Sequence, residues 1–201
     1  MKTVGILTRI DKLNGKSIHY VPSAIIYKLK NKVKIKLIAF TLEDSFENIY
    51  DEIKNCNGIV LPGGDDVYPI ELEVCKYLHQ QNIPTLGICL GMQTMACAFN
   101  GNIGTLSTLD HKVPEGYVHD VVIDDKSFFY QIIKEEKIPV NSRHKDYVIN
   151  TSLNIGAKSL DNVIEEVEDA KKTFFIGVQW HPENLQDKYT NRLFDYFISV
   201  L

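Results

Sequence analysis

A cysteine between two glycines, directly after an apolar segment, is the feature that most limits the folds open to this chain. The apolar segment covers residues 83–88, and Gly87, Cys89 and Gly91 form a Gly-x-Cys-x-Gly pattern. Glycines let backbones approach where a Cβ atom would clash, as a sharp strand-to-helix turn requires. The positive end of the following helix favours the thiolate. The pattern predicts a nucleophile elbow, and its structural alternative is a small buried residue at a tight turn.

Strands and helices alternate along the first half of the chain. Apolar strands are expected over residues 4–7, 34–40, 58–61 and 83–88. Helices are expected over residues 20–29, 43–53, 70–79 and 90–99. Strands that are apolar throughout are typical of a parallel sheet covered on both faces. The segment around Asn14-Gly15, between the first strand and the first helix, is interpreted as a polar loop.

The second half changes to closely spaced strands. These are expected over residues 118–123, 138–140, 155–160, 163–167 and 173–180, with helices over 127–134 and 189–200. Turn-forming residues at 161–162 and 169–172 indicate hairpins, so these later strands are expected to be antiparallel additions. No repeat or linker divides the chain. We therefore predict a single α/β domain over residues 1–201 with a mostly parallel central sheet.

Composition excludes several classes of partner. The net charge is −4, and no block of lysine or arginine indicates binding to nucleic acid or to an anionic membrane. No apolar run approaches the roughly 18 residues of a membrane span. The four cysteines lie far apart and form neither a disulfide framework nor a zinc motif. A reducing cytoplasm is the expected location, where a free thiolate persists.

A histidine and a glutamate close to the last strand supply what a cysteine nucleophile needs. His181 and Glu183 are two positions apart, so on an extended segment their side chains point the same way. Glu183 would accept a hydrogen bond from one ring nitrogen of His181 and leave the other nitrogen facing Cys89. The pair predicts a general base with its orienting partner.

Backbone donors for an oxyanion are expected at two positions. Leu90 follows Cys89 at the start of a helix, and Gly64 follows the strand over residues 58–61. Sites in parallel sheets lie at the carboxyl ends of strands, where these two N–H groups would meet. The alternative for Gly64 is an ordinary Pro-Gly-Gly turn.

Three motifs in this order resemble the class I glutamine amidotransferase family. They are Pro62-Gly63-Gly64, the stretch 87–93 and the stretch 177–183. Within the family, the stretches 61–69 and 140–144 are similar to the freestanding γ-glutamyl peptide and γ-glutamyl-γ-aminobutyrate hydrolase branch. The resemblance spans residues 3–200 and implies a flavodoxin-like three-layer sandwich with added antiparallel strands. It implies neither a metal nor an organic cofactor.

The resemblance implies a cysteine hydrolase of a γ-glutamyl amide-type bond. Cys89 would attack the γ-carbonyl and form a glutamyl thioester. His181 would protonate the departing amine and then activate water, while Glu183 would orient His181. Gly64 and Leu90 would form the oxyanion hole. The products would be L-glutamate and an amine or a phosphoramidate.

Substrate-binding residues are also implied. Gln93 would hold the glutamyl group, and Ser142, Arg143 and His144 would line the pocket. Arg143 and Arg9 would meet an anionic leaving group, because arginine forks suit carboxylate and phosphate. A candidate substrate is a γ-glutamyl-nucleotide phosphoramidate (γ-glutamyl-CDP-amidate) of capsule phosphoramidate biosynthesis. That both arginines are structural or solvated remains an alternative.

Two other functions stay open. Leu90 occupies a position where the hydrolase branch usually has arginine and where ammonia-producing amidotransferases have leucine. The chain would then be a glutaminase subunit that delivers ammonia to a partner synthetase. A non-catalytic ligand-binding protein of the same fold is the second alternative. His111 and His119 are interpreted as ordinary hydrogen-bonded histidines near the site.

Overall fold

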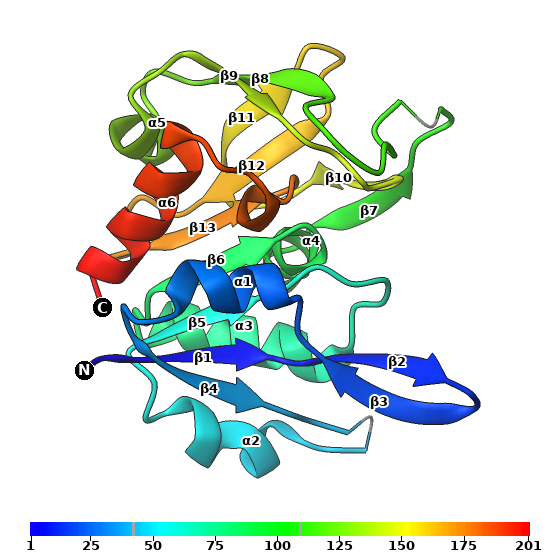
Figure 1. The fold of residues 1–201 in the computed structure, drawn as a ribbon, viewed down its shortest axis with the longest axis vertical. Coiled ribbons are helices and arrows are strands. Elements are labelled where there is room, and N and C mark those ends of the chain that lie inside the picture. The colour runs from blue at the N-terminus through cyan, green and yellow to red at the C-terminus, as the bar shows by residue number, and fades with distance from the viewer. Residues whose placement is uncertain (42, 109) are drawn as a thin grey trace.

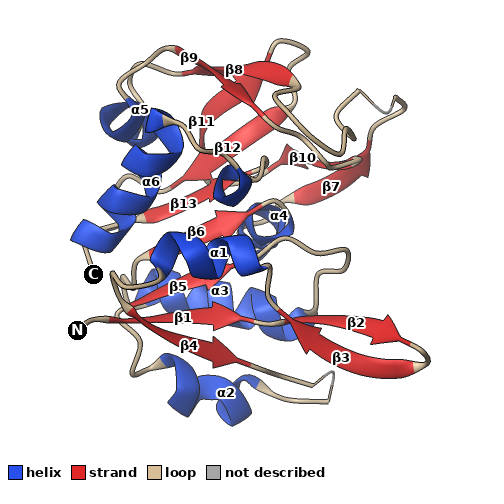
Figure 2. Cartoon of the chain, viewed as in Figure 1, coloured by secondary structure: helices blue, strands red, loops and turns tan. Residues whose placement is uncertain are grey.

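The fold is described from a computed structural model that covers residues 1–41, 43–108 and 110–201. Within these residues one nine-stranded sheet crosses the molecule in the order β4-β1-β5-β6-β13-β12-β11-β8-β9 (Figures 1 and 2). Its strands are β1 (Thr3–Leu7), β4 (Lys34–Ile38), β5 (Gly58–Leu61), β6 (Thr85–Ile88), β8 (His119–Ile123), β9 (Lys137–Val140), β11 (Asn154–Ser159), β12 (Ile164–Glu168) and β13 (Phe175–Val178).

The parallel half of the sheet places the candidate site. β4, β1, β5, β6 and β13 run in the same direction, with Leu61 opposite Gly87 and Ile88 opposite Val178. All residues of β5, β6 and β13 are buried. Because the carboxyl ends of parallel strands share one edge, the segments after these three strands converge there.

The antiparallel half follows the predicted hairpins, with one correction. β12, β11, β8 and β9 each pair antiparallel with their neighbours. The sequence also predicts β13 as an antiparallel addition. It pairs antiparallel with β12 but parallel with β6, so it joins the two halves. Hairpin turns reveal only the sequence-adjacent partner of a strand, which explains why the pairing with β6 is not predicted.

Helices cover both faces of the sheet, as predicted for a three-layer α/β fold. They are α1 (Ser23–Leu29), α2 (Phe46–Ile53), α3 (Pro69–Gln80), α4 (Leu90–Ala98), α5 (Phe128–Ile133) and α6 (Lys188–Ser199). Residues of α1, α5 and α6 share one buried cluster with the sheet, including Ile25, Phe129 and Phe197. Residues of α2, α3 and α4 share another, including Leu78 and Met95. None of the helices in the described residues is both long and apolar enough to cross a bilayer.

Two small sheets are not predicted from the sequence. The expected loop around Asn14-Gly15 is a hairpin of β2 (Arg9–Leu13) and β3 (Lys16–Tyr20). Asn14 and Gly15 have φ angles of 51° and 74°, which matches the two-residue hairpin turn that Asn-Gly favours. β7 (Asn102–Thr105) pairs with β10 (Asp146–Asn150). Half-exposed segments this short carry little periodicity, so they resemble loops in the sequence.

The buried carboxyl group of Glu166 should make the stability of the sheet depend on pH. It is fully buried in β12, and burial together with the charge of Glu168 raises its pKa well above the usual range. A raised pKa in the folded state favours folding at low pH and weakens stability as pH rises above the unfolded value. We expect Glu166→Gln to raise the melting temperature at pH 7 and to have little effect near pH 4. Thermal unfolding followed by circular dichroism at both pH values measures this, and a destabilised variant at pH 7 would contradict it.

Candidate active site

Cys89 lies at the turn between β6 and α4 in a conformation that side chains rarely adopt. Its φ and ψ angles are 52° and −108°. Its N–H donates to the Val178 carbonyl at 2.8 Å, which ties the turn to β13. A Cβ atom on Gly91 would lie 2.0 Å from the Leu61 carbonyl oxygen, and one on Gly87 would lie 2.5 Å from the Met95 sulfur. Both glycines are therefore required for this sharp turn.

His181 follows β13 and is oriented from two sides. Its Nδ1 lies 2.9 Å from Oε1 of the buried Glu183. The segment forms a short 3-10 helix (Pro182–Asn184) rather than the expected extended chain, yet the two side chains still meet. Asn141, a residue not singled out from the sequence, accepts from the His181 N–H and donates to the His181 carbonyl, both at 2.9 Å. These contacts fix the backbone as well as the ring.

Gly63 brings Cys89 and His181 together. A Cβ atom at Gly63 would lie 2.9 Å from His181 Cε1 and 3.4 Å from the Cys89 Cβ. Burial lowers the pKa of His181, but hydrogen bonding to Cys89 and Glu183 raises it more strongly, to about 10. The contacts with Cys89 and Glu183 therefore favour the protonated imidazole beside the sulfur. This arrangement suits a nucleophile with an adjacent proton donor.

The two residues predicted to supply oxyanion donors are neighbours in space. A Cβ atom on Gly64 would be 3.1 Å from Leu90 Cδ2, and Gly64 lines the same cavity as Cys89. Leu90 is the first residue of α4, so its N–H has no acceptor within the helix. This geometry supports the oxyanion-hole prediction, which stays a prediction.

The structure does not support Arg9 as an anion-binding residue. Arg9 is 2% exposed, and its guanidinium pairs with the buried Glu71 carboxylate of α3. Its Nε donates to the Pro62 carbonyl at 3.0 Å, and its Nη2 donates to the same oxygen. The guanidinium is thus occupied by the protein itself. It anchors the loop that carries Gly63 and Gly64.

A cavity of about 410 Å³ opens beside Cys89. Its lining includes three cations, Lys112, Arg143 and Lys145, and three acids, Asp65, Asp66 and Asp146. No ion pair among the described residues involves the three cations. Lys112 is not predicted from the sequence, because it lies in a different segment from Arg143. The two are joined by an antiparallel bridge.

Two predicted substrate residues have other contacts. Ser142 is fully buried, and its Oγ donates to the His111 carbonyl at 2.6 Å, so its hydroxyl is not available to substrate. His144 lines the cavity, but its Nδ1 lies 3.0 Å from the Asp146 carbonyl oxygen and its Nε2 faces Glu165. His144 therefore shapes the cavity wall, whereas Ser142 lies behind it and holds the His111 segment.

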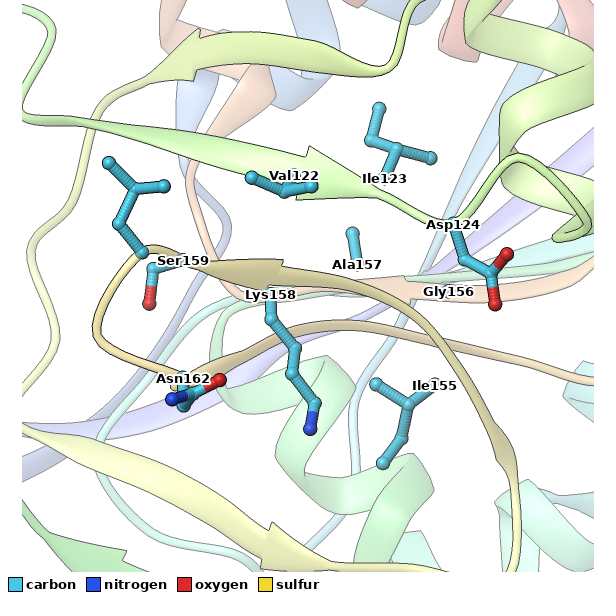
Figure 3. A pocket seen from close by; sticks show the side chains of 10 residues that line it. Val122, Ile123, Asp124, Ile155, Gly156, Ala157, Lys158, Ser159 and Asn162 are labelled. Carbon is cyan, nitrogen blue, oxygen red and sulfur yellow. The ribbon is translucent and has the colours of Figure 1, made fainter.

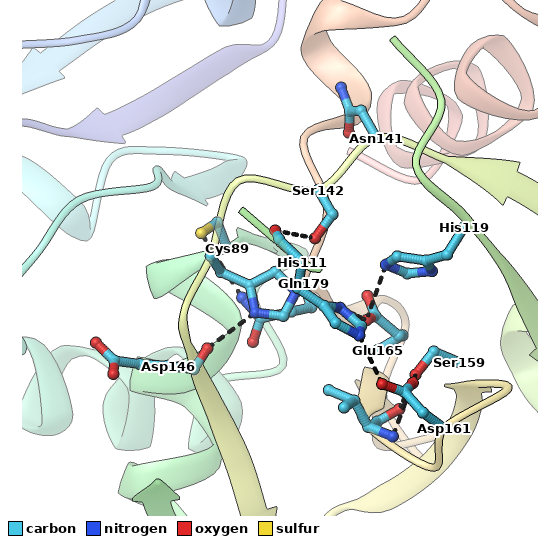
Figure 4. Close-up of polar contacts among 12 residues, drawn as sticks. Cys89, His111, His119, Asn141, Ser142, Asp146, Ser159, Asp161, Glu165 and Gln179 are labelled. Atoms are coloured by element: carbon cyan, nitrogen blue, oxygen red, sulfur yellow. Dashed lines mark hydrogen bonds and ion pairs between the residues drawn. The ribbon is translucent and has the colours of Figure 1, made fainter. Parts of the chain in front are cut away.

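Gln93 supports a residue that the sequence does not single out. Its Nε2 donates to the Asp146 carbonyl at 2.8 Å and to Gln179 Oε1 at 3.1 Å. Gln179, fully buried, places its Nε2 3.6 Å from the Cys89 sulfur (Figure 4). Both amide hydrogens of Gln93 are used internally. The predicted contact of Gln93 with a glutamyl group would therefore have to use its oxygen.

A second cavity, of about 580 Å³, lies along β8 and β11 and is separate from this site (Figure 3). Its lining includes Val122, Asp124 and Lys158 and none of Cys89, His181 or Glu183. Because Cys89 lines only the smaller of these two cavities, that cavity is the candidate active site.

The chain matches one family model and is similar to several named proteins. The family model described as "Glutamine amidotransferase class-I" matches residues 14–200. Anthranilate synthase component 2 of Cyanophora paradoxa is 33% identical over 75% of this chain and 80% of its own length. A subunit of the glutamine-hydrolyzing GMP synthase of Methanococcus aeolicus is 31% identical over 84% of each chain. The CTP synthase of Bacteroides fragilis is 27% identical over 76% of this chain but only 35% of its own length.

Two solved structures share the fold. A GMP synthase subunit protein of Thermoplasma acidophilum has a TM-score of 0.73 at 21% identity, covering 100% of this chain and 94% of its own. The glutaminase domain of Trypanosoma brucei CTPS with bound acivicin has a TM-score of 0.73 at 18% identity, covering 99% and 94%. The predicted flavodoxin-like α/β architecture is confirmed by these matches.

The contact at Gly63 is directly testable. Gly63→Ala would push a methyl group against the His181 ring, so we expect the rate of Cys89 alkylation by iodoacetamide at pH 7 to fall about tenfold or more. Peptide mapping by mass spectrometry measures this rate. Gly104→Ala, whose methyl would lie 3.0 Å from the Tyr147 ring, is the control. An unchanged rate in a folded Gly63→Ala protein would show that Gly63 does not position His181.

The charge on His181 depends on Glu183. We expect Glu183→Gln to lower the His181 pKa from about 10 towards 6.5, as followed by NMR titration of its ring proton. Because the folded pKa is raised, His181 stabilises the fold fully below pH 6.5, and this contribution is lost as pH rises through about 10. Asp169→Asn, which removes the partner of His79, is the control and should leave His181 unchanged.

Proposed function

The chain belongs to the class-I glutamine amidotransferase family, and on that premise we propose that it hydrolyses the C–N bond of a γ-glutamyl amide through Cys89. The observation that carries this proposal is the strained turn at Cys89 beside the His181–Glu183 pair. A cysteine held at positive φ next to a cationic histidine has no evident structural purpose. Such strain is typical of reactive residues.

The proposed reaction has two steps. The Cys89 thiolate attacks the γ-carbonyl carbon, and the oxyanion that forms accepts hydrogen bonds from the Leu90 and Gly64 N–H groups. His181 donates its proton to the nitrogen as the C–N bond breaks, which leaves a thioester. His181 then takes a proton from water, and the hydroxide displaces the sulfur to release glutamate. Glu183 keeps the ring aligned in both steps.

The relatives support glutamine as the substrate and ammonia as the product. They include one subunit of a glutamine-hydrolyzing GMP synthase and component 2 of an anthranilate synthase. By analogy, the chain would act as a glutaminase subunit that delivers ammonia to a partner synthetase. Leu90 agrees with this proposal, since leucine after the nucleophile is typical of ammonia-producing amidotransferases. Residues 1–201 would act as one domain in a reducing compartment, where its four cysteines stay free.

The charged residues of the cavity wall favour a second candidate function. Lys112, Arg143 and Lys145 line the space next to Cys89 and have no acidic partner among the described residues. Neutral ammonia needs no such group, whereas an anionic leaving group would. The chain would then hydrolyse a freestanding γ-glutamyl conjugate with a phosphate-bearing second half. A γ-glutamyl-nucleotide phosphoramidate of capsule phosphoramidate biosynthesis fits this chemistry.

One substrate panel separates the two candidates. Glutamate release is measured from glutamine, γ-glutamyl-γ-aminobutyrate and γ-glutamyl-CDP-amidate, with wild type, Cys89→Ser and Arg143→Ala. If the leaving group is anionic, Arg143→Ala should lower kcat/KM for the phosphoramidate about 10–100-fold. If the chain is a glutaminase, glutamine is preferred and Arg143→Ala has little effect. Lys171→Ala, an exposed charge outside the cavity, is the control.

Loss of all three activities in Cys89→Ser is expected under either candidate. Mass spectrometry should also find a covalent adduct on Cys89 after treatment with a glutamine-like electrophile. A chain that forms no adduct and hydrolyses none of the amides would be a non-catalytic ligand-binding protein, and the proposal would be wrong.

A further inference from the structure

Three of the six histidines converge on one buried carboxylate behind the cavity wall. Figure 4 labels two of them, His111 and His119, beside Glu165. His111 lies in the loop before β8, His119 begins β8, and His144 lies in the loop between β9 and β10. Oε1 of Glu165, in β12, is 3.4 Å from His111 Nδ1, 3.5 Å from His119 Nε2 and 3.6 Å from His144 Nε2. The four candidate ligand atoms all lie within 4.8 Å of one another.

These inner atoms are buried and lack hydrogen bonds. Within the described part of the chain, no hydrogen-bond partner is found for the inner nitrogen of any of the three rings or for either oxygen of Glu165. Their separations of 3.4–3.6 Å exceed the length of an N–H···O hydrogen bond. A buried polar group without a partner costs about 1–3 kcal/mol, and several in one place are unusual.

The outer nitrogens explain why the inner ones present lone pairs. His111 Nε2 lies 2.9 Å from the Asp161 carboxylate, and His144 Nδ1 lies 3.0 Å from the Asp146 carbonyl oxygen. Each outer nitrogen must carry the proton to donate there, so the inner nitrogen of a neutral ring is a bare acceptor. Acceptors that face a carboxylate repel one another unless a cation lies among them.

From this geometry we propose that His111, His119, His144 and Glu165 bind one divalent transition-metal ion, with zinc as the best match. Tetrahedral zinc with bonds of about 2.0–2.1 Å to nitrogen and oxygen has ligands roughly 3.3–3.4 Å apart, close to the 3.4–3.6 Å between Glu165 Oε1 and the three ring nitrogens. Imidazole ligands favour zinc, copper, iron or nickel over magnesium or calcium. A carboxylate or carbonyl behind a ligating histidine is the usual arrangement at such sites. Four protein ligands describe a closed, structural site.

A shared proton is the rival occupant. In that case His111 would be protonated at Nδ1, and this proton would point at Glu165 Oε1, 3.4 Å away. That proton would satisfy only one of the three contacts. The inner nitrogen of His144, whose outer nitrogen carries the proton, would still face the carboxylate without a donor. A metal ion satisfies all four groups at once.

The site would fix the wall of the active-site cavity. The Ser142 Oγ donates to the His111 carbonyl, and the Val113 N–H donates to the Ser142 carbonyl at 3.0 Å. These bonds join the two loops that carry Lys112 and Arg143. Binding His111 and His144 to β12 through a metal would hold both loops in place. The Glu165 carbonyl also accepts from the Gln179 N–H at 2.8 Å, so the site adjoins the contacts of Cys89 without taking part in the reaction.

Metal content is the first test. The full chain is purified without a histidine tag, equilibrated with zinc, dialysed and measured by inductively coupled plasma mass spectrometry. We expect about one zinc per chain in wild type and in Cys89→Ser, because the site needs no thiolate. His119→Ala should contain at least tenfold less bound zinc per chain. His79→Ala, which changes a histidine paired with Asp169 elsewhere in the fold, should retain the zinc. Wild type without stoichiometric metal would overturn the proposal and leave the shared proton.

A spectroscopic test needs only the wild-type protein, so it holds even if the histidine variants do not fold. X-ray absorption at the zinc edge of the wild-type protein should show a first shell of nitrogen and oxygen only. A sulfur ligand would place the metal on a cysteine and overturn the assignment. Chelation should lower the melting temperature of wild type, and zinc but not magnesium should restore it. A melting temperature that does not respond to either treatment would also contradict the proposal.

Discussion

The positive φ angle of Cys89 is the constraint on which the candidate site depends. Such a conformation costs about 1–3 kcal/mol and persists only where its surroundings enforce it. Here the surroundings are the buried parallel strands β5, β6 and β13, with Gly91 packed against the Leu61 backbone and the Cys89 N–H bonded to Val178. The same strand order brings Gly63 and His181 to the sulfur. The strain and the assembly of the site therefore have one origin.

The two halves of the sheet supply different parts of the site. The parallel half carries Cys89 as the proposed nucleophile, the His181–Glu183 pair and the proposed oxyanion donors. The antiparallel half carries the three cations of the cavity, Lys112, Arg143 and Lys145. Their loops contact β12, where His111 and His144 face Glu165. Gln179 connects them, because its N–H bonds to Glu165 in β12 and its side chain reaches Cys89. Asn141, which holds the His181 backbone, and Gln93, which donates to the Asp146 carbonyl, also join the two halves at the site.

Burial decides which charges are available to a ligand. From the sequence, Arg9 and Arg143 are both expected to bind an anionic leaving group. Arg9 is enclosed by Glu71 and the Pro62 carbonyl, so it holds the glycine loop in place. Arg143 is exposed beside Lys112 and Lys145 in the cavity. The difference arises because Arg9 follows β1, which has a strand on each side, whereas Arg143 lies on a loop at the antiparallel side.

Local patterns determined much of this protein from sequence alone. Apolar strands, glycines around Cys89 and the i, i+2 spacing of His181 and Glu183 act over a few residues, so the α/β layers and the elbow could be predicted. The Asn14-Gly15 dipeptide is itself a hairpin signal, but the short strands on either side of it resemble a loop in the sequence. Only the tertiary structure decided the convergence of His111, His119 and His144 on Glu165, since it depends on the order of strands in the sheet and on loops that have no periodicity of their own.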